Sequence, residues 1–115
     1  MDKALKRKWV RALRSGSYRQ AREVLRDTDK KRPKYCCLGV LARIQGATWD
    51  YNNVPVLDGR VVGYSENPTS FLTPKAAGGM SISVQHTLSD MNDGKMFSRA
   101  CSFKEIADYI EKKIK

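Results

Sequence analysis

Hydrophobic positions recur with a helical period at the beginning of the chain. Trp9 and Leu13 fall on one side of a helix turning about 100° per residue, and charged residues fall on the other. Asp2, before this pattern, is a typical N-cap residue, and Gly16 is typical of the position after a helix. The pattern therefore predicts a helix over residues 2–14.

A second pattern of the same kind follows directly. Ser17 and Gln20 have the spacing of a capping box, in which each side chain satisfies a free backbone N–H at the start of a helix. The apolar residues after them, among them Leu25, again share one helical face. We predict a second helix over residues 18–26, so that residues 1–34 form a basic helical hairpin.

The middle of the chain contains the most apolar stretch and the best hairpin signal. Residues 36–45 are expected to form a central buried helix, with a buried strand as the competing interpretation. Gly39 would allow another element to approach this helix closely. Further on, Asp58 and Gly59 lie between β-branched runs, which predicts a two-residue β-hairpin turn.

Two more helices are predicted after the hairpin, over residues 83–91 and 103–114. The last one has a clear start, because Ser102 and Glu105 form a capping box. At 115 residues the chain has room for one domain, over residues 1–115. The expected fold class is α-dominated α+β, with about five helices around a central buried helix plus one small β-hairpin.

Charge is distributed unevenly along the chain. The net charge is +10, and residues 1–34 hold 13 Lys and Arg against four acidic residues, whereas residues 35–115 hold nine against eight. A one-sided positive field attracts polyanions such as nucleotides and nucleic acids. The predicted ligand-binding residues are therefore the cations on the exposed helix faces and two nearby tyrosines: Lys3, Arg7, Arg11, Arg14, Tyr18, Arg19, Arg22, Arg26 and Tyr35.

Several other classes of function lack support in the sequence. No apolar run approaches the roughly 20 residues that cross a bilayer, and the N-terminus lacks a secretory signal, so no membrane partner is expected. Three cysteines, two of them adjacent, make a poor disulfide framework and favour a reducing cytoplasm. They also lack the ligand spacing of a zinc site, and we expect neither metal nor cofactor.

Catalysis has one weak candidate. His86 lies one helical turn before Asp90, and with Cys37 or Cys101 nearby these residues would form a nucleophile site. No flanking motif supports it, and no phosphate-binding glycine motif is present. We therefore predict no catalytic residues and no enzyme, and interpret the histidine and cysteines as structural.

Three blocks of sequence carry a family resemblance. The first comprises Trp9, residues 12–16 (ALRSG), Tyr18 and Gln20; the second is 35–41 (YCCLGVL); the third is Asn92-Asp93 with 102–111 (SFKEIADYIE). Together they resemble small, mostly uncharacterised accessory proteins of tailed bacteriophages. The stretch 94–101 departs from the pattern, because it is longer than the usual connection.

The resemblance implies an accessory protein that works in the cytoplasm of a bacterial host, often against its antiviral defences. Combined with the basic surface, it leads to the hypothesis of a non-catalytic protein that captures an anionic ligand, either a nucleotide signal or a nucleic acid. A protein inhibitor of a defence system, similar to anti-CRISPR proteins, is the alternative, and an enzyme of unrecognised chemistry comes third. Self-association into a homo-oligomer stays open.

Overall fold

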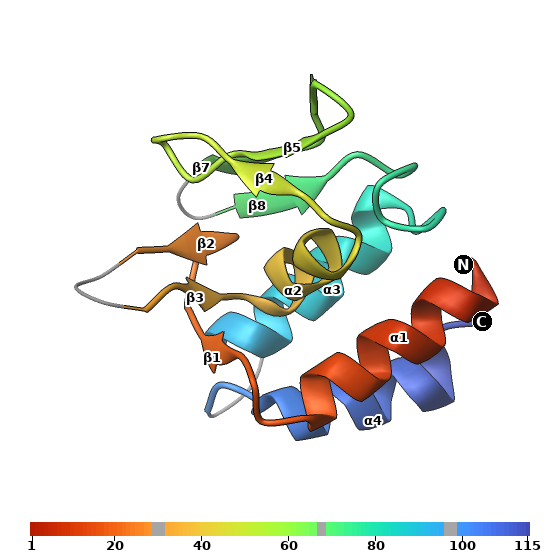
Figure 1. Ribbon diagram of the computed structural model, residues 1–115. Helices are drawn as coiled ribbons and strands as arrows, with labels where there is room; N and C mark the ends of the chain where they lie inside the picture. Colours follow the sequence, from red (N-terminus) through yellow and green to blue (C-terminus); the bar gives the residue numbers. More distant parts are fainter. Residues whose placement is uncertain (29–31, 67–68, 96–98) are drawn as a thin grey trace.

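The computed structural model describes residues 1–28, 32–66, 69–95 and 99–115, apart from the side chains of residues 65, 66 and 69. Four helices and eight short strands occur in these residues (Figure 1). The helices are α1 (Lys3–Arg14), α2 (Cys37–Ile44), α3 (Ile82–Asp93) and α4 (Phe103–Lys113). The strands are β1 (Arg19–Gln20), β2 (Arg26–Asp27), β3 (Lys34–Tyr35), β4 (Thr48–Trp49), β5 (Pro55–Leu57), β6 (Arg60–Val61), β7 (Gly63–Glu66) and β8 (Thr69–Leu72).

The strands form three small sheets. Their orders are β1-β3-β2, β4-β5-β6 and β7-β8, and only the β1–β3 pair is parallel among the described strands. The prediction of about five helices with one hairpin is therefore wrong for the described part of the chain. Several of these strands are only two residues long. Such strands are too short to show the alternating apolar and polar pattern by which a strand is predicted from sequence.

The predicted helix over residues 18–26 is also wrong. Its backbone groups bond to distant parts of the chain instead of to one another: the Ala21 N–H donates to the Tyr35 carbonyl at 2.7 Å, and the Leu25 carbonyl accepts from the Cys36 N–H at 3.2 Å. The described residues of the range 1–34 are consequently one helix followed by strands and bends, not a helical hairpin. Tertiary contacts override an amphipathic pattern here.

The close approach expected at Gly39 explains how this segment is held. A Cβ atom on Gly39 would lie 1.9 Å from the Leu25 carbonyl oxygen, so only glycine lets the segment pass over α2. The prediction of a close contact at Gly39 is confirmed, and so is the helical interpretation of the central block. The Cys36 sulfur caps α2 by accepting from the Gly39 N–H at 3.4 Å.

The buried amide of Asn92, at the end of α3, joins the same segment to the core. Asn92 is 0% exposed; its amide nitrogen donates to the Ala21 carbonyl at 2.8 Å, and its oxygen accepts from the Gln20 side chain and the Cys37 N–H. Every backbone group that Asn92 satisfies would otherwise be buried without a partner. The amide therefore satisfies the Ala21 carbonyl, which would have had a local partner in a helix.

The remaining predicted elements are confirmed. The hairpin turns at Asp58 and Gly59, whose φ angles of 52° and 75° fit a type I′ turn, and it joins β5 to β6. At α4 the Ser102–Glu105 capping box is present. Residues 29–31, 67–68 and 96–98 lie outside the described residues, so the connection over residues 94–101 is described only in part.

Candidate anion-binding surface

The cations of α1 are positioned by the opposite, apolar face of that helix. Trp9 and Leu13 are 0% and 2% exposed, and the Trp9 indole N–H donates to the Cys37 carbonyl at 2.8 Å. The Asp2 carboxylate caps the helix by accepting from the Leu5 N–H at 2.7 Å. With one face fixed in the core, the charged face must point outward.

Helix α4 lies beside α1 and runs in the opposite direction (Figure 1). At one end Arg14 forms an ion pair with Asp108 at 2.7 Å, and at the other the Lys6 ammonium donates to the Ile114 carbonyl. The earlier residue of α1 thus contacts the later residue near α4, as an antiparallel pair of helices requires.

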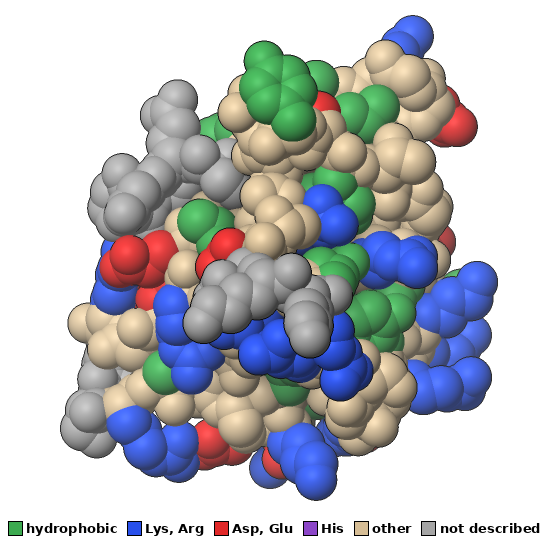
Figure 2. All heavy atoms as spheres, turned by 60° about the vertical axis from the view of Figure 1, so that its left-hand side comes forward, with side chains coloured by type: hydrophobic (Ala, Val, Ile, Leu, Met, Phe, Trp, Pro, Cys, Tyr) green, Lys and Arg blue, Asp and Glu red, His purple; other side chains and the backbone are tan. Residues whose placement is uncertain are grey.

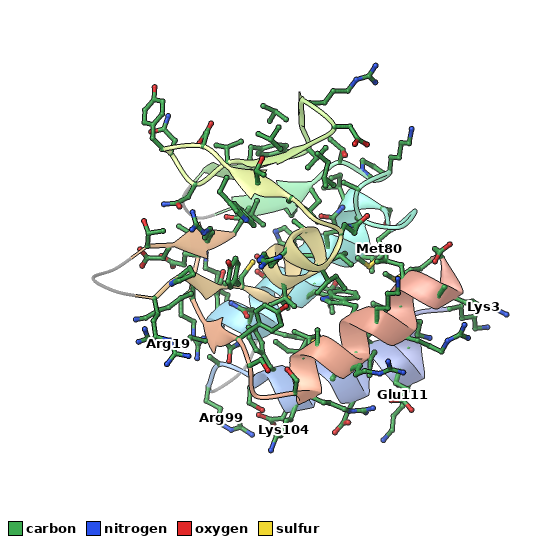
Figure 3. All side chains as sticks on the ribbon, viewed as in Figure 1. Lys3, Arg19, Met80, Arg99, Lys104 and Glu111 are labelled. Carbon is green, nitrogen blue, oxygen red and sulfur yellow. The ribbon has the colours of Figure 1, made fainter. Side chains whose placement is uncertain are left out.

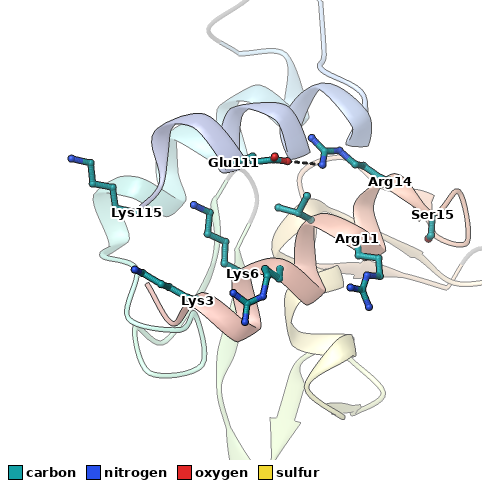
Figure 4. Close-up of a pocket in the computed structure, with 9 residues that line it drawn as sticks. Lys3, Lys6, Arg11, Arg14, Ser15, Glu111 and Lys115 are labelled. Atoms are coloured by element: carbon teal, nitrogen blue, oxygen red, sulfur yellow. Dashed lines mark ion pairs between the residues drawn. The ribbon is translucent and has the colours of Figure 1, made fainter.

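An open groove of about 950 Å³ follows the solvent side of this helix pair (Figure 4). We call it the α1–α4 groove. Glu111 is the one acidic residue among the described residues that line it. Its six cations are Lys3, Lys6, Arg7, Arg11, Arg14 and Lys115.

The cations of the groove differ in how far they are already paired. Arg14 contacts Asp108 and, at 2.5 Å, Glu111, and these hydrogen bonds raise the pKa of its guanidinium above the ordinary value. Within the described residues Lys3, Arg7 and Arg11 form no ion pair, so their charge is available to a ligand. Figure 4 shows Arg11 pointing away from α4, whereas Arg14 reaches toward Glu111.

The structure brings four of the nine predicted site residues into the groove and places the other five outside it. Arg19 and Arg22 are exposed, and Arg19 is the register partner of Lys34 in the β1–β3 pair. Figure 3 shows Arg19 at the end of the molecule opposite Lys3. Figure 2 shows the side that carries β1, β2 and β3, where Lys and Arg side chains gather across the middle. The basic surface thus extends beyond the groove.

The two predicted tyrosines pack inward. Tyr35 is 6% exposed, and its ring lies 5.8 Å from the Tyr18 ring in an edge-to-face contact. On its other side the Tyr35 ring lies 5.7 Å from the Trp49 ring. Such contacts stabilise a core. Tyr35 is therefore not available to stack on a ligand.

Arg26 has a structural position as well. Its guanidinium lies 5.6 Å from the centre of the Trp49 ring and donates to the Asn53 side chain at 3.0 Å. Two buried donors of this pair, Arg26 Nε and Trp49 Nε1, have no acceptor in the described part of the chain. Arg26 thus joins β2 to the loop over residues 50–54.

Sequence reasoning missed the groove residues that lie outside the predicted stripe. Lys6 follows Lys3 by three positions, so helical periodicity could have placed the two side chains next to each other. Glu111 and Lys115 join the site only because α4 packs beside α1. Nothing in the local sequence of α4 reveals that neighbour.

The catalytic alternative is a nucleophile site formed by His86, Asp90 and a cysteine. His86 Nδ1 lies 3.2 Å from the Asp90 carboxylate, as the spacing predicts, but the described residues show no hydrogen bond from His86 to a cysteine. Burial raises the pKa of the Cys36 thiol to about 12 and also raises the pKa of Cys37, so both thiols stay protonated and are poor nucleophiles.

The described residues lack two further features. They contain no group of three or more His, Cys, Asp or Glu side chains that could hold a metal ion. None of their helices is both long enough and apolar enough to span a membrane.

No curated protein and no solved structure matches the chain. A family described as a domain of unknown function, DUF8296, matches residues 1–76. The matched range includes α1, α2 and the eight described strands, whereas α3 and α4 lie beyond it. With about two thirds of its length matched, the chain belongs to the DUF8296 family.

Proposed function

We propose that this chain is a non-catalytic nucleic-acid-binding protein whose α1–α4 groove holds a phosphate backbone. The observation that supports the proposal is the composition of the groove, which has six cations and one acid among its described lining residues. Phosphate contacts of this kind supply most of the sequence-independent affinity for nucleic acids.

The shape of the groove favours a strand over a single nucleotide. A nucleotide signal would call for an enclosed pocket, and the α1–α4 groove is open to solvent (Figure 4). Arg7 and Arg11 are one helical turn apart, about 6 Å along the axis, and the charged line from Lys3 to Arg14 extends about 16 Å. That length covers several successive phosphates of a strand.

The biological setting belongs to the same proposal. The resemblance to accessory proteins of tailed bacteriophages supports a role in the cytoplasm of a bacterial host, where binding of nucleic acid would counter a defence system. A protein inhibitor of such a system is the second candidate. It is favoured by exposed apolar side chains on the small sheets, where Val61 is 62% and Tyr64 is 46% exposed.

The test is binding of labelled nucleic acid as a function of salt concentration. The double reversal Arg7→Glu/Arg11→Glu removes two unpaired cations of the groove. We expect affinity to fall at least about tenfold and the slope of log affinity against log salt to decrease by about two.

A matched control keeps the net charge change but leaves the groove intact. Arg60→Glu/Lys75→Glu reverses two exposed cations that do not line the groove. It should bind nearly as the parent does. Equal losses in the two variants would contradict a role for the groove and leave only non-specific attraction to net charge.

A further inference from the structure

Tyr51 is the most exposed large hydrophobic side chain in the described part of the chain. It is 95% exposed, compared with 62% for Val61 and 46% for Tyr64. Its ring contributes almost nothing to the core, since apolar area stabilises a fold only when it is removed from water. A rigid aromatic ring presented to solvent is, however, well suited to binding, because it offers a large contact area at low entropic cost.

The loop that carries Tyr51 is fixed by its own hydrogen bonds. The Asp50 carboxylate accepts from the Asn52 N–H at 2.8 Å and from the Val54 N–H at 3.0 Å. The Asn53 N–H donates to the Asp50 carbonyl at 2.9 Å, and Asn53 adopts a left-handed φ of 60°. This Asx-type turn holds the backbone on both sides of Tyr51. The Tyr51 ring itself stands in solvent, as its exposure shows.

The same loop is attached to the basic side of the molecule. Asn53 accepts from Arg26 at 3.0 Å, and its amide donates to the Thr28 hydroxyl at 3.5 Å. Arg26 lies on β2, in the sheet where Arg19 and Lys34 are register partners. Figure 2 shows this side, with Lys and Arg across the middle and hydrophobic side chains standing above them. An exposed aromatic therefore borders a positive surface.

We infer that Tyr51 is a stacking platform for an unpaired base of a single-stranded nucleic acid. The inference rests on the proposed function, because the phosphates of that strand would follow the basic surface. Proteins that bind single strands combine a positive track with aromatic rings on which bases stack. In a duplex the bases are stacked on one another inside the helix, so a side chain on a rigid surface loop does not reach their faces. The inference thus names the ligand class of the surface as single-stranded.

The test separates stacking from charge by using two strands with the same phosphates. One is an oligothymidylate of about 12 nucleotides, and the other is an abasic strand of equal length that has no bases to stack. Tyr51→Ala should weaken binding of the oligothymidylate about tenfold and leave binding of the abasic strand unchanged. Tyr51→Phe, which keeps the ring, should bind both strands as the parent does.

Tyr64→Ala is the matched control, since it removes a partly exposed tyrosine that lies on β7 and not in the loop of Tyr51. It should bind both strands like the parent. Unchanged oligothymidylate binding in Tyr51→Ala, or an equal loss for the two strands, overturns the inference while leaving charge-dependent binding in place. Binding that ignores the Arg7→Glu/Arg11→Glu reversal contradicts the proposed function instead. A parent protein that binds neither strand contradicts both.

Discussion

Helix α1 and the segment over residues 18–27 are consecutive and both rich in arginine, yet they are ordered in different ways. The backbone of α1 is satisfied within the helix, and its start is capped by the neighbouring Asp2. The backbone of the segment is satisfied by groups far away in the chain, such as the Asn92 side chain. The backbone hydrogen bonds that carry the α1 cations are therefore local, whereas the backbone around Arg19 and Arg22 depends on hydrogen bonds to distant residues.

The largest expected effect comes from the glycine contact that the segment needs. Gly39→Ala places a Cβ 1.9 Å from the Leu25 carbonyl, and the free energy of unfolding should fall by about 4 kcal/mol. Chemical denaturation measures the loss. Gly16→Ala is the control: its φ of +75° costs about 1 kcal/mol, but among the described residues no atom beyond its chain neighbours lies within 4 Å of the new Cβ. Equal losses would mean that the contact at Gly39 is not tight.

The next largest effect concerns the buried amide. Asn92→Ala leaves the Ala21 carbonyl and the Cys37 N–H without their partner, and we expect a loss of about 3 kcal/mol in unfolding free energy. Amide hydrogen exchange should accelerate over residues 18–27 more than in α1. Asn52→Ala, on the surface, should change stability by less than about 0.5 kcal/mol. If amide hydrogen exchange accelerated equally in α1 and in residues 18–27, the two regions would not differ in how their backbones are held.

A smaller effect is expected from the acid within the groove. Glu111 neutralises part of Arg14, so Glu111→Gln should tighten nucleic-acid binding a few-fold, because it removes a negative charge beside the phosphates. Thermal stability should hardly change, since exposed ion pairs contribute little. Asp90→Asn removes one negative charge from α3 and serves as the control. If both variants bound nucleic acid more tightly by the same factor, the location of Glu111 in the groove would not matter.

The smallest effect tests local order at α4. Hydrogen bonds from Arg99 and the Ser102 N–H lower the pKa of Glu105 to about 2, below its ordinary value of 4.5. Because the folded-state pKa is depressed, the stabilisation is complete above pH 4.5 and is lost as the pH falls from 4.5 toward 2. The difference in melting temperature between the parent and Glu105→Gln should shrink over that window. A constant difference would show that the charge of Glu105 is irrelevant.

Local signals predicted the parts of the fold that are locally determined. The Asp2 cap, the Asp58-Gly59 turn and the Ser102 capping box each act within a few residues, so a single sequence reveals them. Segment 18–26 has an amphipathic pattern as well, and Leu25 is buried as that pattern implies. The backbone nevertheless follows distant partners that no local pattern contains.

The candidate site divides in the same way. The charged line on α1 could be predicted because it needs only helical periodicity. The contribution of α4 could not, since it depends on packing between opposite ends of the chain. Tyr51 gave no signal either, because a lone tyrosine in a polar loop is unremarkable until its exposure is known.

The pairing of α1 with α4 has a consequence for the order of events during synthesis. The ion pair between Arg14 and Asp108 joins residues 94 positions apart. A ribosome adding about 5–20 residues per second needs on the order of 5 to 20 seconds to make that stretch. Throughout this time the nascent chain carries the cations of α1 without their neighbouring helix. The groove is therefore among the last features of the molecule to form, and ribosome-bound chains that lack α4 have its α1 side without Glu111 and Lys115.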